Sequence, residues 1–284
     1  MKAFLESELT PAMNDAAGFH VIPAPMEMSV SYGRGTRRGP QAIIAASQQL
    51  EADIYGFRPG DIGIHTQTPI APKTKTAGAW LDAITARVAE ALRHQAIPVL
   101  LGGEHTVTLG AARAFQGTGA TIGFIHFDAH ADLRDNYEGS PFSHACVMRR
   151  VHELGFPILQ IGTRALAQEE RDYRTANPKT IIAYDGIDIA DGHMPRHFIP
   201  RGFPRAVYVS FDVDGLDPSV MPATGTPVPG GLFWYDVVRM LREIVSTRHL
   251  QGIDIVEFAP SPGLHHADFT AALLTQLLMA MAIR

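Results

Sequence analysis

The chain has 284 residues, of which 46% are hydrophobic and 19% charged, and its formal net charge is -5. A chain of this length buries roughly three quarters of the surface that it exposes when unfolded, so we expect a large core without covalent staples. The single cysteine, Cys146, excludes an intramolecular disulfide and a zinc site built from several cysteines. The slight acidity and the lack of a Lys/Arg cluster argue against a nucleic-acid partner.

No segment of the sequence predicts a membrane span. The longest nearly apolar run, residues 273–283, has about half of the roughly 20 residues that a span needs. Near the N-terminus, Glu6 and Glu8 interrupt any apolar core of a signal peptide. We therefore expect no membrane association and a cytoplasmic location.

Short runs rich in Val, Ile and Phe alternate with stretches of helical spacing along the chain. The predicted strands cover residues 20–22, 97–101, 121–127, 158–161, 180–183, 206–211 and 252–256. The predicted helices cover residues 80–92, 144–154, 235–244 and 267–281, and a further helix begins at Gly39-Pro40. This alternation indicates an α/β fold whose mostly parallel sheet is covered by helices on both faces. Because no linker divides the pattern, we expect a single domain over residues 1–284.

Acids and histidines gather where three of the predicted strands end. Gly-Gly-Glu-His occupies residues 102–105, Asp-Ala-His-Ala-Asp residues 128–132, and Asp-Val-Asp residues 212–214. Alternate side chains of a strand point to one side, and parallel sheets place ligands at the carboxyl ends of their strands. The metal-competent side chains in these segments are His105, Asp128, His130, Asp132, Asp212 and Asp214.

This set of side chains predicts a metal centre. Taken singly, each aspartate could instead cap a helix or stabilise a turn. Carboxylates packed together repel one another by several kcal/mol at low dielectric, and cations remove that repulsion. Six ligands are too many for one tetrahedral zinc, so we expect two metals that share bridging carboxylates. Oxygen ligands with two imidazoles and no thiolate favour manganese over zinc.

The same segments resemble the signature segments of the ureohydrolase family, which contains arginase and agmatinase. The resemblance rests on residues 102–105, 127–132 and 210–218, and it continues, in the family's order, through residues 33–40, 160–164 and 222–227. It implies a three-layer α/β/α fold with a central, mostly parallel sheet of about eight strands. It also implies a metal-dependent C–N hydrolase that acts on linear amidines and assembles as a homo-oligomer, a trimer or a hexamer.

The family pattern implies a role for each proposed metal ligand. Asp128 and Asp212 would bridge two manganese ions. The remaining ligands would divide into His105 with Asp132 on one ion and His130 with Asp214 on the other. A hydroxide held between the ions would attack the guanidinium carbon of a small guanidino substrate.

Further residues carry over from the family pattern. Glu257, which follows predicted strand 252–256, would accept hydrogen bonds from the substrate guanidinium. His144 resembles the histidine that contacts the substrate and transfers protons, with a water-exposed histidine at a helix N-terminus as the alternative. Thr226 would line the guanidinium pocket, with a turn residue as the alternative. Asp132 would also help to orient and relay the proton.

Other polar residues have structural interpretations. His126 lies deeper in its strand than Asp128 and is interpreted as a core histidine or as one that supports the ligands from behind. Cys146 lies in an apolar helical stretch and is expected to pack rather than react. Asp217, which precedes Pro218, is expected to shape a loop.

Two segments depart from the family pattern. Phe258-Ala259 replaces the Asn-Pro pair that commonly follows the glutamate, and Pro25-Met26-Glu27 replaces a Pro-Phe-Asp element. Neither segment contains a proposed metal ligand, so the expected reaction class is unaffected. Their effect is expected on pocket shape and therefore on substrate.

The loop after the Asp-Ala-His-Ala-Asp segment bears on the substrate. The Thr/Ser-rich stretch with which arginases contact the α-carboxylate and α-amino group is missing here. The loop instead resembles agmatinase sequences with Tyr-Glu-Gly, at 137–139, before Ser-His-Ala, at 143–145. Asp135 or Glu138 would attract a second cationic group at the far end of the substrate. Agmatine, cleaved to urea and putrescine in polyamine biosynthesis, is therefore the expected substrate, with guanidinobutyrate and arginine as alternatives.

Two other classes of protein compete with this interpretation. One is a catalytically idle scaffold of the same fold, which the intact ligand set argues against because such a cluster costs stability without metals. The other is a metal-dependent deacetylase on a related fold. The two aspartate-rich segments favour two metals over the one metal of such a deacetylase.

Overall fold

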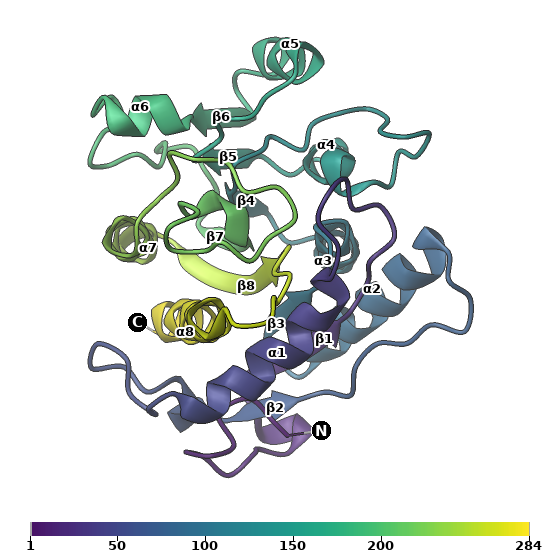
Figure 1. Cartoon of the computed structure of the whole chain (residues 1–284), viewed down its shortest axis with the longest axis vertical. Helices are drawn as coiled ribbons and strands as arrows, with labels where there is room; N and C mark the ends of the chain where they lie inside the picture. The colour runs from purple at the N-terminus through teal and green to yellow at the C-terminus, as the bar shows by residue number, and fades with distance from the viewer. Residues whose placement is uncertain (1, 284) are drawn as a thin grey trace.

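One parallel sheet runs through the molecule (Figure 1). The computed structural model describes residues 2–283, so the two end residues of the expected domain lie outside it. The described chain forms eight strands in the order β2-β1-β3-β8-β7-β4-β5-β6. The strands are β1 (Phe19–Ala24), β2 (Ile64–Thr66), β3 (Ile97–Gly102), β4 (Ile122–Phe127), β5 (Ile158–Ile161), β6 (Ile181–Tyr184), β7 (Ala206–Asp212) and β8 (His249–Val256). Every neighbouring pair is parallel, which confirms the predicted sheet.

Helices cover both faces of this sheet (Figure 1). One face is covered by α1 (Gly39–Ala46), α7 (Trp234–Thr247) and α8 (His265–Ala282), and the other by α2 (Ala77–Arg93), α3 (Val107–Thr118) and α4 (Val147–Glu153). Two further helices, α5 (Gln168–Ala176) and α6 (Gly186–Ala190), follow β5 and β6 near one edge. The expected three-layer α/β/α arrangement is confirmed.

The central strands are buried on both faces, which explains their continuous apolar runs. In β3, Val99 and Leu101 belong to the core under α1, α7 and α8, whereas Leu100 belongs to the core under α2, α3 and α4. Ile255 and Val256 of β8 divide in the same way. Alternate side chains of one strand therefore supply both cores.

The sequence pattern located most elements but not all of them. Each predicted strand coincides with an observed strand, whereas β2 was not predicted. The helix predicted for residues 144–154 is divided into a 3-10 turn, His144–Cys146, and α4. Helices α3, α5 and α6 were not predicted. None of the helices between residues 2 and 283 is long and apolar enough to cross a membrane.

The order of the strands determines where a ligand can bind. The chain places β1 to β3 on one side of the sheet and β4 to β6 on the other, and then inserts β7 and β8 between β3 and β4 (Figure 1). The carboxyl ends of β3, β8, β7 and β4 therefore lie next to one another. In open α/β sheets, ligands bind at such a switch in strand order.

Candidate active site

The structure brings the six proposed metal ligands together at the carboxyl ends of β3, β4 and β7. One ends β7, and the others lie in the loops that follow these strands: His105, Asp128, His130, Asp132, Asp212 and Asp214. All are buried except His130, which is half-buried. Their arrangement agrees with the alternation expected from the sequence, and their individual roles stay predictions.

The first part of the cluster surrounds the imidazole of His105. Its Nδ1 lies 3.2 Å from Oδ2 of Asp128 and 3.1 Å from Oδ2 of Asp132. Oδ2 of Asp212 is 3.3 Å from the same nitrogen. Three carboxylates from two strands thus converge on one ring nitrogen.

The second part of the cluster surrounds His130. Its Nδ1 lies 3.0 Å from Oδ2 of Asp214 and 3.4 Å from Oδ1 of Asp128. Asp128 therefore faces His105 with one oxygen and His130 with the other. This is the position that a carboxylate bridging two metals would occupy.

Among the described residues, the carboxylates of the cluster form ion pairs with histidines and with no Lys or Arg side chain. Burial opposes protonation of His105, but the three surrounding carboxylates raise its pKa well above the usual value. Burial also opposes protonation of His130, but the two carboxylates beside it raise its pKa to about 12. Burial and the charge of Asp128 raise the pKa of Asp132 to about 7. The raised pKa values mean that bound protons offset the negative charge of the cluster. Divalent cations would offset the same charge.

Hydrogen bonds fix the orientation of the His105 ring. Its Nε2 lies 2.8 Å from Oγ of Ser210, and this hydroxyl donates to Oδ1 of Asp254 at 2.8 Å. Since the Ser210 hydroxyl donates to Asp254, its oxygen accepts a hydrogen bond from Nε2–H of His105, and Nδ1 faces the carboxylates. Nδ1 is buried without a hydrogen-bond partner among the described residues. A lone pair facing three carboxylate oxygens is repulsive unless a proton or a metal cation lies between them, so these residues fit a bound metal.

A third histidine, His126, also lies within reach of the cluster. Its Nε2 is 2.7 Å from Oδ2 of Asp128, and its Nδ1 is 2.9 Å from Nε2 of Gln160. Arg174 orients the Gln160 amide by donating from Nε to Oε1 at 2.9 Å. Gln160 therefore donates to Nδ1, and neutral His126 donates its Nε2 proton to Asp128. This geometry agrees with the interpretation that His126 supports a ligand from behind.

A small cavity of about 20 Å³ adjoins the cluster, and Glu257 lines it. Glu257 follows β8, is 8% exposed, and accepts the backbone N–H of His105 at 2.7 Å. Burial and the charge of Glu104 raise the pKa of Glu257 well above its usual value. A cationic guanidinium beside Glu257 would stabilise the ionised carboxylate. Thr226 lines the same cavity, with its hydroxyl 3.4 Å from Oδ2 of Asp214.

His144 lines this cavity too, held by serines that the sequence analysis did not identify. Oγ of Ser31 lies 2.9 Å from its Nε2, and Oγ of Ser29 lies 3.2 Å from its Nδ1. Glu104 anchors the loop that carries Ser29 and Ser31, because its carboxylate accepts the backbone N–H and the hydroxyl of Ser29 at 2.6 and 2.9 Å. His144 is thus half-buried and hydrogen-bonded rather than water-exposed, and burial lowers its pKa.

The loops that carry Gly33 and Gly225 meet beside the small cavity. The backbone N–H of Gly33 donates to the carbonyl of Gly225 at 3.1 Å, and a Cβ on Gly33 would lie only 2.8 Å from the Gly225 Cα. Only glycine allows this approach, which places Thr226 beside the cavity. Arg164 fixes the loop below by donating to the carbonyl of Asp214 at 2.6 Å.

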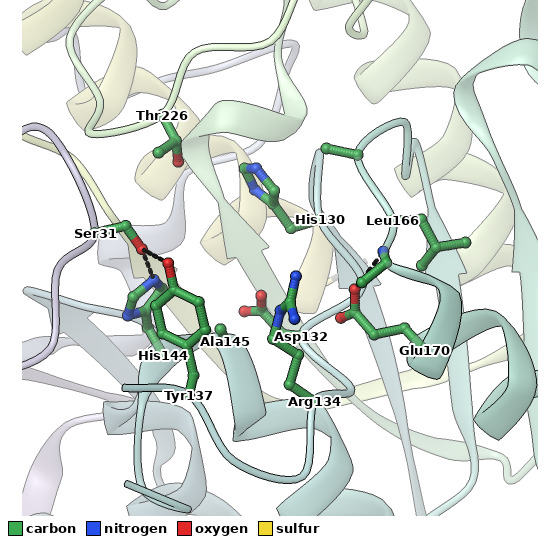
Figure 2. A pocket seen from close by; sticks show the side chains of 12 residues that line it. Ser31, His130, Asp132, Arg134, Tyr137, His144, Ala145, Leu166, Glu170 and Thr226 are labelled. Carbon is green, nitrogen blue, oxygen red and sulfur yellow. Dashed lines mark hydrogen bonds between the residues drawn. The ribbon is translucent and has the colours of Figure 1, made fainter. Parts of the chain in front are cut away.

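A larger cavity of about 420 Å³ shares lining residues with the small one (Figure 2). The residues common to both cavities are Ser31, His130, Asp132, His144 and Thr226. Figure 2 shows Tyr137, Arg134 and Glu170 on the walls of the larger one.

Neither Asp135 nor Glu138, the residues expected to attract the far end of a substrate, lines the cavity. Oδ1 of Asp135 lies 2.5 Å from Nη2 of Arg150 instead, and Glu138 is exposed.

The departures from the family pattern lie outside both cavities. Glu27 accepts the backbone N–H groups of Gly35 and Arg37 at 3.0 and 2.9 Å and so holds the loop that leads to α1. Phe258 is fully buried in the core. Cys146 is also buried, and burial raises the pKa of its thiol to about 11, as expected for a packing residue.

Comparisons with known proteins identify the family of this chain. A family model described as "Arginase family" matches residues 17–283. The N(1)-aminopropylagmatine ureohydrolase of Synechocystis sp. is 39% identical over 98% of this chain and 93% of its own length. The agmatinase of Pyrococcus horikoshii is 30% identical over 94% of this chain and 93% of its own. The crystal structure of the agmatine ureohydrolase of Thermoplasma volcanium superimposes with a TM-score of 0.85 at 28% identity, covering 100% of this chain and 94% of that one. The chain therefore belongs to the arginase family of ureohydrolases.

Proposed function

We propose that this chain is a dimanganese amidinohydrolase that cleaves a small guanidino compound to urea and an amine. The observation that carries the proposal is the buried carboxylate of Glu257, which lines the same small cavity as the His/Asp cluster. A planar cation held by this carboxylate would present its central carbon to the cluster.

The proposed metals would be held by the six side chains of the cluster. When bound, they would supply a nucleophile at neutral pH, because coordination can lower the pKa of water from 15.7 to about 7. Glu257 accepts hydrogen bonds from the guanidinium and fixes its orientation, and Thr226 forms the adjacent wall. His144 is neutral near pH 7 because burial lowers its pKa, so it can accept a proton and return it to the leaving amine. Asp132 lines both cavities and relays that proton.

Agmatine is the proposed substrate, with putrescine and urea as products. Support comes from the missing Thr/Ser-rich stretch and from relatives named agmatinase, such as that of Pyrococcus horikoshii. A site adapted to an amino acid would need partners for its α-carboxylate, because a mismatched buried end group costs orders of magnitude in specificity.

N(1)-aminopropylagmatine is a second candidate, favoured by a specific observation. Four relatives between 34% and 39% identical carry the name N(1)-aminopropylagmatine ureohydrolase. The larger cavity, of about 420 Å³, offers room for a tail longer than that of agmatine.

A urea-release assay distinguishes these candidates. The values of kcat/KM would be compared for agmatine, N(1)-aminopropylagmatine, 4-guanidinobutyrate and arginine, with manganese present. A higher value for arginine or 4-guanidinobutyrate than for agmatine would reject agmatine, and a higher value for N(1)-aminopropylagmatine would select the second candidate. No urea from any of them would favour the catalytically idle scaffold.

The proposal extends to the organisation of the protein. The single sheet to which every described strand belongs supports one domain for the whole chain. Family membership supports a homo-oligomer, a trimer or a hexamer, which sedimentation velocity would measure. The expected location is the cytoplasm.

A further inference from the structure

An ion pair stands at the wall of the larger cavity. Arg134 lines this cavity, and its Nη1 lies 2.9 Å from Oε1 of Glu169. The guanidinium carbon also lies 5.4 Å from the centre of the Tyr137 ring. Figure 2 shows Arg134 between Tyr137 and Glu170 in this view. Among the described residues that line the cavity, Arg134 is the only Lys or Arg.

Glu169 is the carboxylate that balances Arg134. The neighbouring Glu170 lines the cavity as well, but its oxygens accept the backbone N–H groups of Leu133 and Ala167 at 2.9 and 2.8 Å. Glu170 is therefore engaged within the protein. Glu169 does not line the cavity itself. It pairs with Arg134 from outside, with its side chain 46% exposed beside an Arg134 side chain that is 34% exposed, so it acts on a ligand through the charge of Arg134.

The tail of a bound substrate would reach this pair. The small cavity beside Glu257 has only about 20 Å³, so it has no room for the tail of a substrate. The rest of the substrate must then extend into the larger cavity, since the two share lining residues. The far end of a guanidino compound consequently lies on the side where Arg134 is found.

We infer that the Arg134–Glu169 pair determines which end group the substrate carries, an inference that rests on the proposed amidinohydrolase function. An uncompensated Arg134 would attract a carboxylate tail and repel an ammonium tail. Glu169 cancels that charge, so the cavity accepts an ammonium and gives a guanidino acid no advantage. Arg134 and Glu169 are specificity-determining residues in this scheme, and neither takes part in bond cleavage.

The test changes one charge of the pair at a time. Glu169→Gln keeps the shape of the side chain and exposes the charge of Arg134. We expect the ratio of kcat/KM for agmatine to that for 4-guanidinobutyrate to fall about tenfold, mainly through KM, and the effect to shrink in high salt. Arg134→Gln should raise the same ratio, and the double variant should return it toward the wild-type value. Butylguanidine, whose tail is uncharged, is the reference substrate for each variant.

A matched control removes a similar charge that does not pair with Arg134. Asp135 lies next to Arg134 in the sequence, but its carboxylate pairs with Arg150 and does not line the cavity. Asp135→Asn should leave the substrate ratio unchanged. If 4-guanidinobutyrate is not turned over, its inhibition constant replaces kcat/KM.

The outcomes separate this inference from the proposed function. The inference is overturned if Glu169→Gln leaves the ratio at the wild-type value, or if Asp135→Asn shifts it equally. Should Glu169→Gln be inactive on every substrate, an unchanged ratio in Arg134→Gln would overturn it. Wild-type protein that releases urea from no guanidino compound would instead refute the proposed function itself.

Discussion

Asp132 and Glu257 each combine a buried carboxylate with a left-handed backbone. Their φ angles are 53° and 59°, a region that few residues other than glycine adopt. Such conformations cost about 1–3 kcal/mol and cluster at sites where the surrounding structure enforces them. At Glu257 the enforcement is visible, because its backbone N–H donates to the carbonyl of Gly103 at 2.8 Å while its carboxylate accepts from His105. Two of the six non-glycine residues with positive φ in the described chain are therefore those proposed for proton relay and substrate binding.

Replacing Glu257 by glutamine tests its proposed role directly. The variant keeps the shape of the side chain and removes the charge that would face the guanidinium. We expect kcat/KM to fall by about three orders of magnitude while metal content stays the same, because a charge-assisted, bidentate contact is lost in a buried site. Urea release and elemental analysis measure the two quantities. Glu153→Gln, an exposed charge change in α4, is the control, and near wild-type turnover in Glu257→Gln would refute the assignment.

Replacing Asp128 by alanine tests the proposed sharing of ligands. Its two oxygens face different histidines, so its loss should remove a ligand from both metal positions. Elemental analysis of protein reconstituted with manganese should find fewer than two ions per chain, and Asp212→Ala should behave alike. Asp135→Ala is the control on the same loop. At most one metal in fully active wild-type protein would contradict the two-metal proposal.

At the residue scale, the sequence predicted the ligands better than the groups that hold them. Apart from His105, the proposed ligands follow apolar strands with a spacing of two residues, and this spacing is visible in the sequence. Ser29 and Ser31 approach His144 from a loop more than a hundred positions away, and no local pattern encodes that contact. Glu104 was noticed in a motif, but its task of anchoring Ser29 depends on the same long-range packing.

At the scale of elements, periodicity failed where burial is two-sided or the element is short. Most residues of α3 are buried, so no polar stripe marks it as a helix. Strand β2 has only three residues, too few for an alternating pattern. The amphipathic helix α7 was predicted almost to its ends because its apolar residues occupy one face.

The loop after β7 is organised by one carboxylate, Asp217. Its oxygens accept the hydroxyl and backbone N–H of Ser219 and the backbone N–H groups of Gly230 and Gly231. The hydrogen bond from the Ser219 hydroxyl is the largest influence that lowers the pKa of Asp217, to about 2. This agrees with the expected loop-shaping role.

Asp217→Asn should therefore destabilise the protein in a pH-dependent way. A carboxyl group whose pKa is about 2 in the folded state and about 3.9 in the unfolded state stabilises the fold above pH 3.9 and ceases to do so as the pH falls toward 2. Since Asp217 is partly exposed, the expected loss in unfolding free energy is about 1 kcal/mol at pH 6. Urea unfolding of wild type and variant at pH 6 and pH 3 measures it. A difference that does not shrink at pH 3 would contradict this account, and Asp191→Asn on an exposed turn is the control.

At the scale of the whole molecule, the site and the fold share the same four strands. The cluster lies where β3, β8, β7 and β4 end, and these are the middle strands of the sheet. Binding energy gained at this point acts on the centre of the fold, because unfolding would disperse ligands drawn from loops after β3, β4 and β7. We therefore expect bound metal to stabilise the fold as well as to support the reaction.

Removal of metal should therefore lower the thermal stability of the entire chain. A ligand that binds only the folded state at 100 times its Kd adds about 2.7 kcal/mol. Since about 1 kcal/mol shifts Tm by roughly 2–4 °C in proteins of comparable size, chelation should lower Tm by about 5 °C or more. Added manganese should restore Tm in a concentration-dependent way, whereas Asp128→Ala should respond weakly to it. Differential scanning calorimetry provides the measurement. A wild-type Tm that is insensitive to chelator and to manganese would mean that the carboxylates of the cluster are stabilised by protons rather than by metal.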